Sequence, residues 1–173
     1  WAERYQGPVM LLSEHSLAER AQNIRKPDLA RVPVESRDVY AGDAGYLRYQ
    51  STGISPIPVP GTPGSYIANG SEHDVFGDTT HLGKYHIHMT ERRFGKLKLL
   101  EDGDYEAENV GAKVAVMPWG GSKGPVREAF DQLVAAGVDL GWYYTMYVSP
   151  LPAAMLGELQ SKELVIVPEL NYQ

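Results

Sequence analysis

Cysteine is absent from the 173 residues of this chain. The chain therefore cannot form a disulfide, build a thiolate zinc site or ligate an iron–sulfur cluster through thiolates. Positive charge is also scarce, because 16 Lys and Arg stand against 22 Asp and Glu, for a net charge of −6. Nucleic acids and anionic membrane surfaces demand clustered positive charge, so neither is expected as a partner. The lack of cysteine suits a cytoplasmic protein, which is the location we expect.

Long apolar runs are lacking as well. None approaches the ~20 residues that a membrane-spanning helix needs, and no secretory signal is visible. At 173 residues the chain can hold one full domain, or one domain and part of another. It opens at Trp1 shortly before an apolar segment and stops soon after another one, so we expect it to be part of a longer polypeptide.

No histidine follows His88, and this absence decides how one motif is interpreted. Gly120, Ser122 and Gly124 have the spacing of a hydrolase nucleophile elbow, between a predicted strand and a predicted helix. In that fold the acid and the histidine come after the serine. Without a base, a serine hydroxyl is a weak nucleophile. We therefore interpret the motif as a structural turn and assign no catalytic residue in this chain.

Proline and glycine divide the chain into regions. Residues 1–26 are predicted to hold an apolar strand at 8–12 and a short helix at 16–22. Residues 27 to about 85 contain six prolines and eight glycines, which predicts a long, extended and irregular segment. The aromatic residues Tyr40, Tyr46, Tyr49 and Tyr66 in that segment are too many for a disordered chain, so we expect packing to order it.

The remaining residues carry a regular apolar pattern. It predicts a helix over 90–100, strands near 113–118, 140–148 and 163–168, and helices near 124–136 and 152–160. The helix near 124–136 has Pro125 in its first turn and Gly137 at its end. Strands that alternate with helices over ~60 residues predict an α/β fold with a mainly parallel sheet flanked by helices.

The sharpest polar cluster is Glu72, His73 and Asp74, which lies between Gly70 and Gly77. A loop that presents acid, imidazole and acid can bind a ligand or move a proton. The same residues can equally make turn and cap contacts in a surface loop. Both interpretations stay open from the sequence.

Two further clusters are weaker. His86 and His88 would share one face of a strand, with His81 nearby, but no third ligand has diagnostic spacing, so we predict no metal site. The acidic run at 102–108 fails the calcium-loop pattern at its sixth and twelfth positions, Ala107 and Lys113. We interpret that run as a solvated turn.

Two basic features allow a phosphate or an acidic partner as the less favoured alternative. Arg92, Arg93, Lys96 and Lys98 form a basic face on the predicted helix, and most such faces are simply solvated. The glycines at 120–124 precede a helix but lack the full phosphate-loop spacing. Neither feature is assigned as a cofactor-binding site.

An ordered series of motifs spans nearly the whole chain. It comprises RYQGPVMLLS at 4–13, PGTPG at 60–64, GSEHD at 70–74 with Gly77, Arg92, Arg93 and Lys96, WGGSKG at 119–124 with Arg127 and Glu128, PLP at 150–152, and ELNY at 169–172. This series resembles the alpha subunit of 2-oxoacid:ferredoxin oxidoreductases, in particular those that act on 2-oxoglutarate.

The resemblance implies a domain organisation. Residues 1–26 would close a pyrimidine-binding domain for thiamine diphosphate, and 27–104 would be an extended linker and connecting helix. Residues 105–173 would form a transketolase C-terminal-like α/β domain. His73 and Asp74 would lie near the substrate.

The resemblance also implies chemistry. The family oxidatively decarboxylates a 2-oxoacid on thiamine diphosphate, transfers the acyl group to coenzyme A and reduces ferredoxin through iron–sulfur clusters. The clusters, the Mg-bound diphosphate and a beta subunit would belong to the rest of a hetero-oligomeric enzyme, and this chain alone would be inactive. A non-catalytic α/β module that binds a ligand or docks a subunit remains the alternative.

Overall fold

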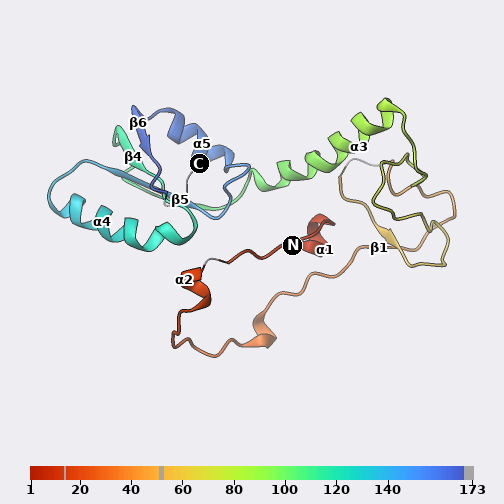
Figure 1. Cartoon of the computed structure of the whole chain (residues 1–173), viewed down its shortest axis with the longest axis horizontal. Coiled ribbons are helices and arrows are strands. Elements are labelled where there is room, and N and C mark those ends of the chain that lie inside the picture. The colour runs from red at the N-terminus through yellow and green to blue at the C-terminus, as the bar shows by residue number, and fades with distance from the viewer. Residues whose placement is uncertain (14, 51–52, 170–173) are drawn as a thin grey trace. The chain divides into compact units, whose positions relative to one another are not determined.

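The computed structural model describes residues 1–13, 15–50 and 53–169 (Figure 1). The chain divides into two compact units, Trp1–Lys96 and Leu97–Gln173. The motif at 169–172 falls almost entirely outside the described residues, since only Glu169 of it is described.

The second unit is an α/β fold built on one four-stranded sheet of order β3-β5-β4-β6. Its strands are β3 Tyr105–Glu108, β4 Val114–Val116, β5 Gly141–Thr145 and β6 Leu164–Ile166; its helices are the 3-10 turn η3 Gly120–Ser122, α4 Lys123–Ala135 and α5 Ala153–Gln160. Strand β4 pairs in parallel with β5 and β6. The three predicted parallel strands and the two helices between them are therefore confirmed, each within a few residues of its expected bounds.

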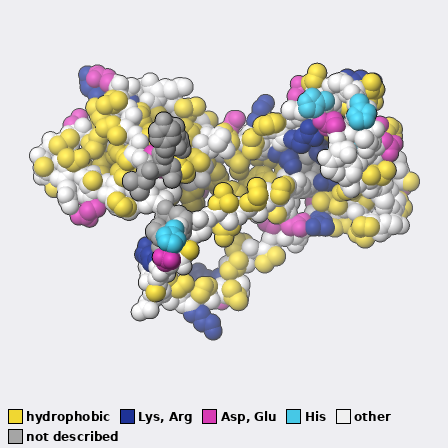
Figure 2. Space-filling view, in the orientation of Figure 1, with side chains coloured by type: hydrophobic (Ala, Val, Ile, Leu, Met, Phe, Trp, Pro, Cys, Tyr) yellow, Lys and Arg dark blue, Asp and Glu magenta, His cyan; other side chains and the backbone are white. Residues whose placement is uncertain are grey.

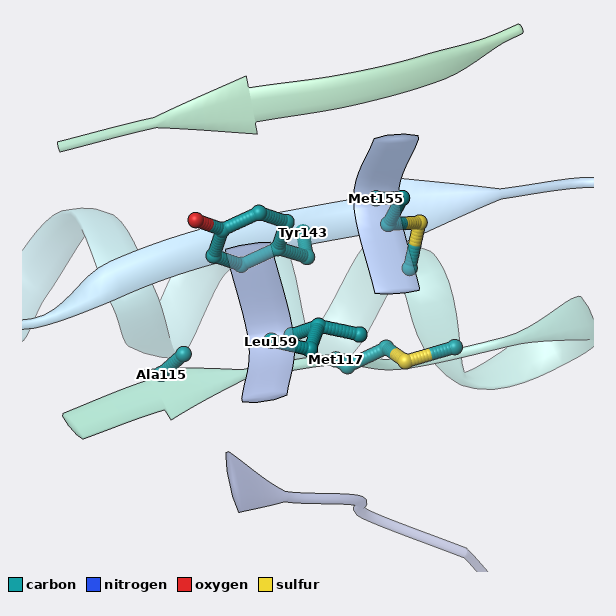
Figure 3. Close-up of a cluster of buried hydrophobic side chains, with 5 residues drawn as sticks. All are labelled: Ala115, Met117, Tyr143, Met155 and Leu159. Carbon is teal, nitrogen blue, oxygen red and sulfur yellow. The ribbon is translucent and has the colours of Figure 1, made fainter. Parts of the chain in front are cut away.

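The two central strands, β4 and β5, are buried on both faces of the sheet, each face against one helix. On one face Ala115, Met117 and Tyr143 pack against Met155 and Leu159 of α5 (Figure 3). On the other face the cluster consists of Val116, Leu140, Trp142 and Phe130 of α4. Consecutive residues of a strand point to opposite faces, so Trp142 and Tyr143, both wholly buried, each anchor one layer. Burial raises the pKa of Tyr143 to about 12.

The solvated turn predicted at 102–108 is wrong over its second half, because residues 105–108 form the edge strand β3, antiparallel to β5. Alternation explains the strand: Tyr105 and Ala107 are half-buried against the α5 layer, whereas Glu106 and Glu108 are exposed. The acidic residues suggested a solvated turn, because the sequence could not show that Glu106 and Glu108 pair with cations of α4.

Two ion pairs join β3 to α4, and each of their cations also lies near an aromatic ring of β5; we call these residues the charge ladder. Lys123 Nζ lies 2.6 Å from a carboxylate oxygen of Glu106 and 3.8 Å from the ring centre of Tyr144. Arg127 binds Glu108 through both terminal nitrogens. Its guanidinium also lies 5.1 Å from the Trp142 ring. Each cation is thus held between a carboxylate and an aromatic ring of the neighbouring strand.

The first unit has little regular structure. It contains the helices α1 Ala2–Tyr5, α2 His15–Ala18 and α3 Gly83–Gly95, the 3-10 turn η1 Leu29–Arg31 and a two-residue parallel pairing of β1 Val39–Tyr40 with β2 Ile57–Pro58; the 3-10 turn η2 Lys96–Leu100 follows α3. The irregular character expected for the region rich in proline and glycine is thus observed. In Figure 1, α3 is its one long helix among the described residues.

Two local predictions in this unit are wrong, and the bounds of a third are shifted. Residues 8–12 form no strand, and Met10, Leu11 and Leu12 are 82–95% exposed, since no neighbouring strand among the described residues pairs with them. The helix expected at 16–22 is the single turn α2. The helix expected at 90–100 begins earlier, at Gly83, and tightens to a 3-10 turn from Lys96. Its first half is polar, so apolar periodicity did not reveal it.

We predict that Arg127 and Glu108 are energetically coupled. A double-mutant cycle with Arg127→Met and Glu108→Gln should give a coupling of about 0.5 kcal/mol, small because both groups are partly exposed and screened by solvent. Urea unfolding at low and high salt measures it, and the coupling should shrink in high salt. The pair of Lys113 and Glu163 is the control and should couple less, because its side chains are more exposed, at 75% and 65% against 35% and 51%. A zero coupling at low salt would contradict the ladder.

Candidate functional site

The loop at 72–80 is a tight, internally bonded turn. The amide of Asp74 donates to the carbonyl of Asp78 (2.9 Å), and the amide of Gly77 donates to the carbonyl of Asp74 (3.1 Å). Gly77 has a φ of +90°, and a Cβ there would lie 2.4 Å from the carbonyl oxygen of Ile67. Glycine is therefore required at this position, both for the backbone conformation and for the close approach.

Asp74 stabilises this turn with its side chain. One carboxylate oxygen accepts hydrogen bonds from the amides of Phe76 (2.9 Å) and Asp78 (3.1 Å). The turn contact that the sequence left open for Asp74 is therefore present. These two amide contacts hold the carboxylate at a defined place in the loop.

His73 is half-buried beside Tyr49, with ring centres 4.3 Å apart. Its Nδ1 lies 2.8 Å from the carbonyl oxygen of Asp74. A carbonyl only accepts, so Nδ1 carries the hydrogen in this contact. In the neutral ring, Nε2 then has a lone pair with which to accept a hydrogen bond or a proton.

Glu72 ties the loop to α3. Its two carboxylate oxygens accept from the two terminal nitrogens of Arg93, each at 3.2 Å. His86 Nδ1 lies 2.5 Å from the same carboxylate. Hydrogen bonds from Arg93 and then His86 lower the pKa of Glu72 to about 2. Figure 2 shows histidine, acidic and basic side chains gathered over the start of α3.

The metal site considered for His81, His86 and His88 required His86 and His88 to share one face of a strand, and they do not. His86 and His88 lie in α3 rather than on a strand, and residues two apart on a helix do not face the same way. Among the residues that the structure describes, no group of three or more His, Asp, Glu or Cys could hold a metal ion.

The basic helix face predicted from the sequence is not one solvated surface. Arg93 is engaged by Glu72, whereas Arg92 is buried and its guanidinium lies 5.4 Å from the Tyr49 ring centre. Lys96 is half-buried and donates to the carbonyl of Gln6 (2.9 Å). Burial lowers the pKa of both Arg92 and Lys96. Periodicity could not distinguish a buried arginine from a solvated one.

Sequence reasoning missed Arg48, which is 8% exposed. It donates to the carbonyl of Ser55 (2.8 Å) and lies 5.2 Å from the ring centre of Tyr66. The one available signal was its place next to Tyr49, in a segment dense in tyrosine.

Ser122 makes local contacts. Its hydroxyl donates to the carbonyl of Trp119 (2.8 Å) and accepts from the amide of the same residue (3.2 Å). The serine thus closes the η3 turn that leads into α4, and residues 97–173 contain no histidine. This geometry agrees with the structural turn predicted from the sequence.

Comparison with known proteins places the chain beside one class of oxidoreductase. It is 29% identical to the 2-oxoglutarate oxidoreductase subunit KorA of Mycobacterium tuberculosis, over 98% of the chain and 27% of that protein. It is 30% identical to subunit alpha of 2-oxoacid:ferredoxin oxidoreductase 2 of Aeropyrum pernix, over 99% of the chain and 28% of that protein. No family model matches the chain.

A solved structure gives the same result. The 2-oxoglutarate:ferredoxin oxidoreductase of Magnetococcus marinus, with 2-oxoglutarate, coenzyme A and succinyl-CoA bound, matches 99% of this chain with a TM-score of 0.84 and 36% identity. The match covers 32% of that solved chain.

The chain is therefore an α/β relative of oxidoreductase subunits. More specifically, it is related over nearly its whole length to the alpha subunits of 2-oxoacid:ferredoxin oxidoreductases, as the motifs indicated. It spans a little under a third of the length of these relatives. Among its described helices, none is both long enough and apolar enough to cross a membrane.

We predict that Arg93 controls the ionisation of Glu72. In the wild-type chain the Glu72 carboxyl should titrate near pH 2, and in Arg93→Gln it should move towards its ordinary 4.5. Because the folded pKa is depressed, the tie between the loop and α3 is complete above about pH 4.5 and is lost as the pH falls through 2. Carbon-13 NMR titration of glutamate carboxyls measures this shift. Lys98→Gln should leave the midpoint unchanged, and an unchanged midpoint in Arg93→Gln would contradict the prediction.

Proposed function

We propose that this chain is a segment of the alpha subunit of a 2-oxoacid:ferredoxin oxidoreductase, with 2-oxoglutarate as the substrate of the whole enzyme. The observation that carries the proposal is the match over 99% of the chain to an enzyme solved with 2-oxoglutarate, coenzyme A and succinyl-CoA bound. The reaction oxidatively decarboxylates the 2-oxoacid to an acyl-CoA and reduces ferredoxin.

The proposal assigns three parts to the chain. Residues 1–26 end a pyrimidine-binding domain, in which the exposed apolar side chains at 9–12 would be covered. Residues 27–104 form a linker and connecting helix, supported by the scarcity of regular elements before α3. Residues 105–173 form a transketolase C-terminal-like domain, supported by three parallel strands with α4 and α5 on opposite faces.

The cofactors of such an enzyme do not suit the side chains of this chain. Iron–sulfur clusters need thiolates, and the sequence has no cysteine. We propose that the clusters, thiamine diphosphate and Mg are held by other parts of a cytoplasmic hetero-oligomer that includes a beta subunit. The glutamate that activates thiamine diphosphate would lie upstream of this chain in the pyrimidine-binding domain. The alternative remains a non-catalytic α/β module that binds a ligand or docks a subunit.

The full-length polypeptide, purified with its beta subunit, should reduce ferredoxin when given 2-oxoglutarate and coenzyme A. The 173-residue chain alone should show no such activity and no micromolar affinity for thiamine diphosphate. Spectroscopic assay of ferredoxin reduction and titration calorimetry measure the two outcomes. If the purified complex reduces no ferredoxin when given 2-oxoglutarate and coenzyme A, the alternative module is favoured.

We further propose that His73 and Asp74 lie near the 2-oxoacid in the assembled enzyme. His73 offers a lone pair on Nε2, and Asp74 holds a negative charge at the adjacent position. 2-Oxoglutarate carries a second carboxylate that pyruvate lacks. The charge of Asp74 would repel that group and so tune the choice of substrate.

Removing the charge of Asp74 should favour 2-oxoglutarate. Asp74→Asn keeps the oxygen that accepts from Phe76 and Asp78, whereas Asp74→Ala loses it. In the complex, Asp74→Asn should raise kcat/KM for 2-oxoglutarate relative to pyruvate by roughly 3- to 30-fold, or ~0.7–2 kcal/mol.

Asp78→Asn, four residues away, is the matched control and should leave the ratio unchanged. Equal losses for both substrates in Asp74→Ala, together with an unchanged ratio in Asp74→Asn, would assign Asp74 to the turn alone.

A further inference from the structure

Asn69 is the one asparagine of this sequence that precedes a glycine. The others, Asn23, Asn109 and Asn171, precede isoleucine, valine and tyrosine. In an Asn-Gly pair the backbone nitrogen of the glycine can attack the side-chain amide carbon of the asparagine, because no glycine side chain crowds the approach. Such a pair can modify itself, with water as the other reactant.

The structure leaves the attacking nitrogen of Gly70 accessible. Asn69 and Gly70 are both exposed. A Cβ at Gly70 would meet no atom within 4 Å beyond its chain neighbours. The Gly70 amide donates no hydrogen bond to any residue that the structure describes. Solvent and base can therefore reach the N–H group that must lose its proton before the attack.

The side-chain carbonyl of Asn69 is held in a way that favours the attack. Its Oδ1 accepts a hydrogen bond from the amide of Ser71 (2.8 Å), so the side chain folds back towards the backbone that follows it. Negative charge develops on Oδ1 when the amide carbon is attacked. A donor already directed at this oxygen stabilises that charge, as a backbone amide does in acyl transfer.

The amide nitrogen of the same side chain joins residue 69 to the turn at 74–78. Asn69 Nδ2 donates to the carbonyl of Gly77 (2.9 Å), and the amide of Gly77 donates to the carbonyl of Asp74 (3.1 Å). Conversion of the amide to a carboxylate replaces this donor with an acceptor. A charged oxygen would then face the carbonyl oxygen of Gly77, so the hydrogen bond would be lost.

We propose that Asn69 and Gly70 form a self-modifying site, and that its conversion loosens the 74–78 turn. The Gly70 nitrogen bonds to Cγ of Asn69, the Cγ–Nδ2 bond breaks, and the departing nitrogen takes up the Gly70 proton and leaves as ammonia. Water then opens the resulting succinimide at either of its two carbonyls, which gives aspartate or isoaspartate at position 69. The reaction needs only water, so the site does not depend on the function proposed above.

Peptide mass spectrometry of the 173-residue chain, incubated in mildly alkaline buffer, measures the conversion. Isoaspartate should appear at position 69 at least about tenfold faster than at Asn23, which is also exposed but precedes the β-branched Ile24. Gly70→Ala should slow the conversion at least about tenfold, because the added methyl group crowds the nitrogen. The variant should keep its fold, since Gly70 has no positive φ and open space beside it.

Three outcomes would overturn the self-modifying site. They are equal rates at Asn69 and Asn23, an unchanged rate in Gly70→Ala, and aspartate formed without isoaspartate. The last outcome is decisive because direct hydrolysis of the amide gives aspartate alone, whereas a succinimide opens in both directions.

Asn69→Asp reproduces one product and tests the effect on the turn. Hydrogen exchange of the Asp74 and Gly77 amides, measured by NMR, should be at least about threefold faster than in the wild-type chain, because a hydrogen bond to the turn is lost. Asn23→Asp adds the same charge at another exposed position of this unit and should leave both rates unchanged. Unchanged exchange in Asn69→Asp would overturn the proposed loosening. If Asn69→Asp does not fold, the converted fraction of the incubated wild-type chain provides the same comparison.

Discussion

Cationic side chains that donate to backbone carbonyls hold the first unit together. Lys96 donates to Gln6, Arg92 to Arg48, and Arg48 to Ser55, so segments far apart in sequence are joined through α3 and the start of η2. Gln6 and Ser55 exchange two further hydrogen bonds. An irregular backbone has carbonyls that no helix or sheet satisfies, and these must find donors. Arginine and lysine supply several donors each, which lets a region poor in apolar core adopt a defined path.

The second unit rests on a different constraint, the burial of both faces of β5. Trp142 faces α4 and Tyr143 faces α5, and both are wholly buried. The parallel strands therefore need a helix on each side, which is why the sequence reads as alternating strands and helices. The antiparallel edge strand β3 satisfies a further requirement. Its acids pair with α4, and charged residues on an edge oppose pairing with another sheet.

The loop at 72–78 is bound to α3 on one side and lines a pocket on the other. On one side, Glu72 is bound by Arg93 and His86 and is fully ionised at neutral pH, so it fixes the loop on α3. On the other side, Val75 and Phe76 line a pocket of about 350 Å³ together with Tyr46, Arg48 and Tyr66. His73 and Asp74 lie between these two features in the sequence, and their orientation follows from the same turn.

The sequence alone determined the α/β character of the second unit, its three parallel strands and its relatives, because both apolar periodicity and ordered motifs are local properties of the chain. It also marked Glu72, His73 and Asp74 as one cluster, since they are adjacent. Only the tertiary structure showed that residues 105–108 form β3, because the partners of their acids lie on α4, later in the sequence. It likewise decided that Arg48 and Arg92 are buried, and that residues 8–12 pair with no strand among the described residues. Each of these depends on contacts between residues far apart in sequence, and a local pattern contains no information about such contacts.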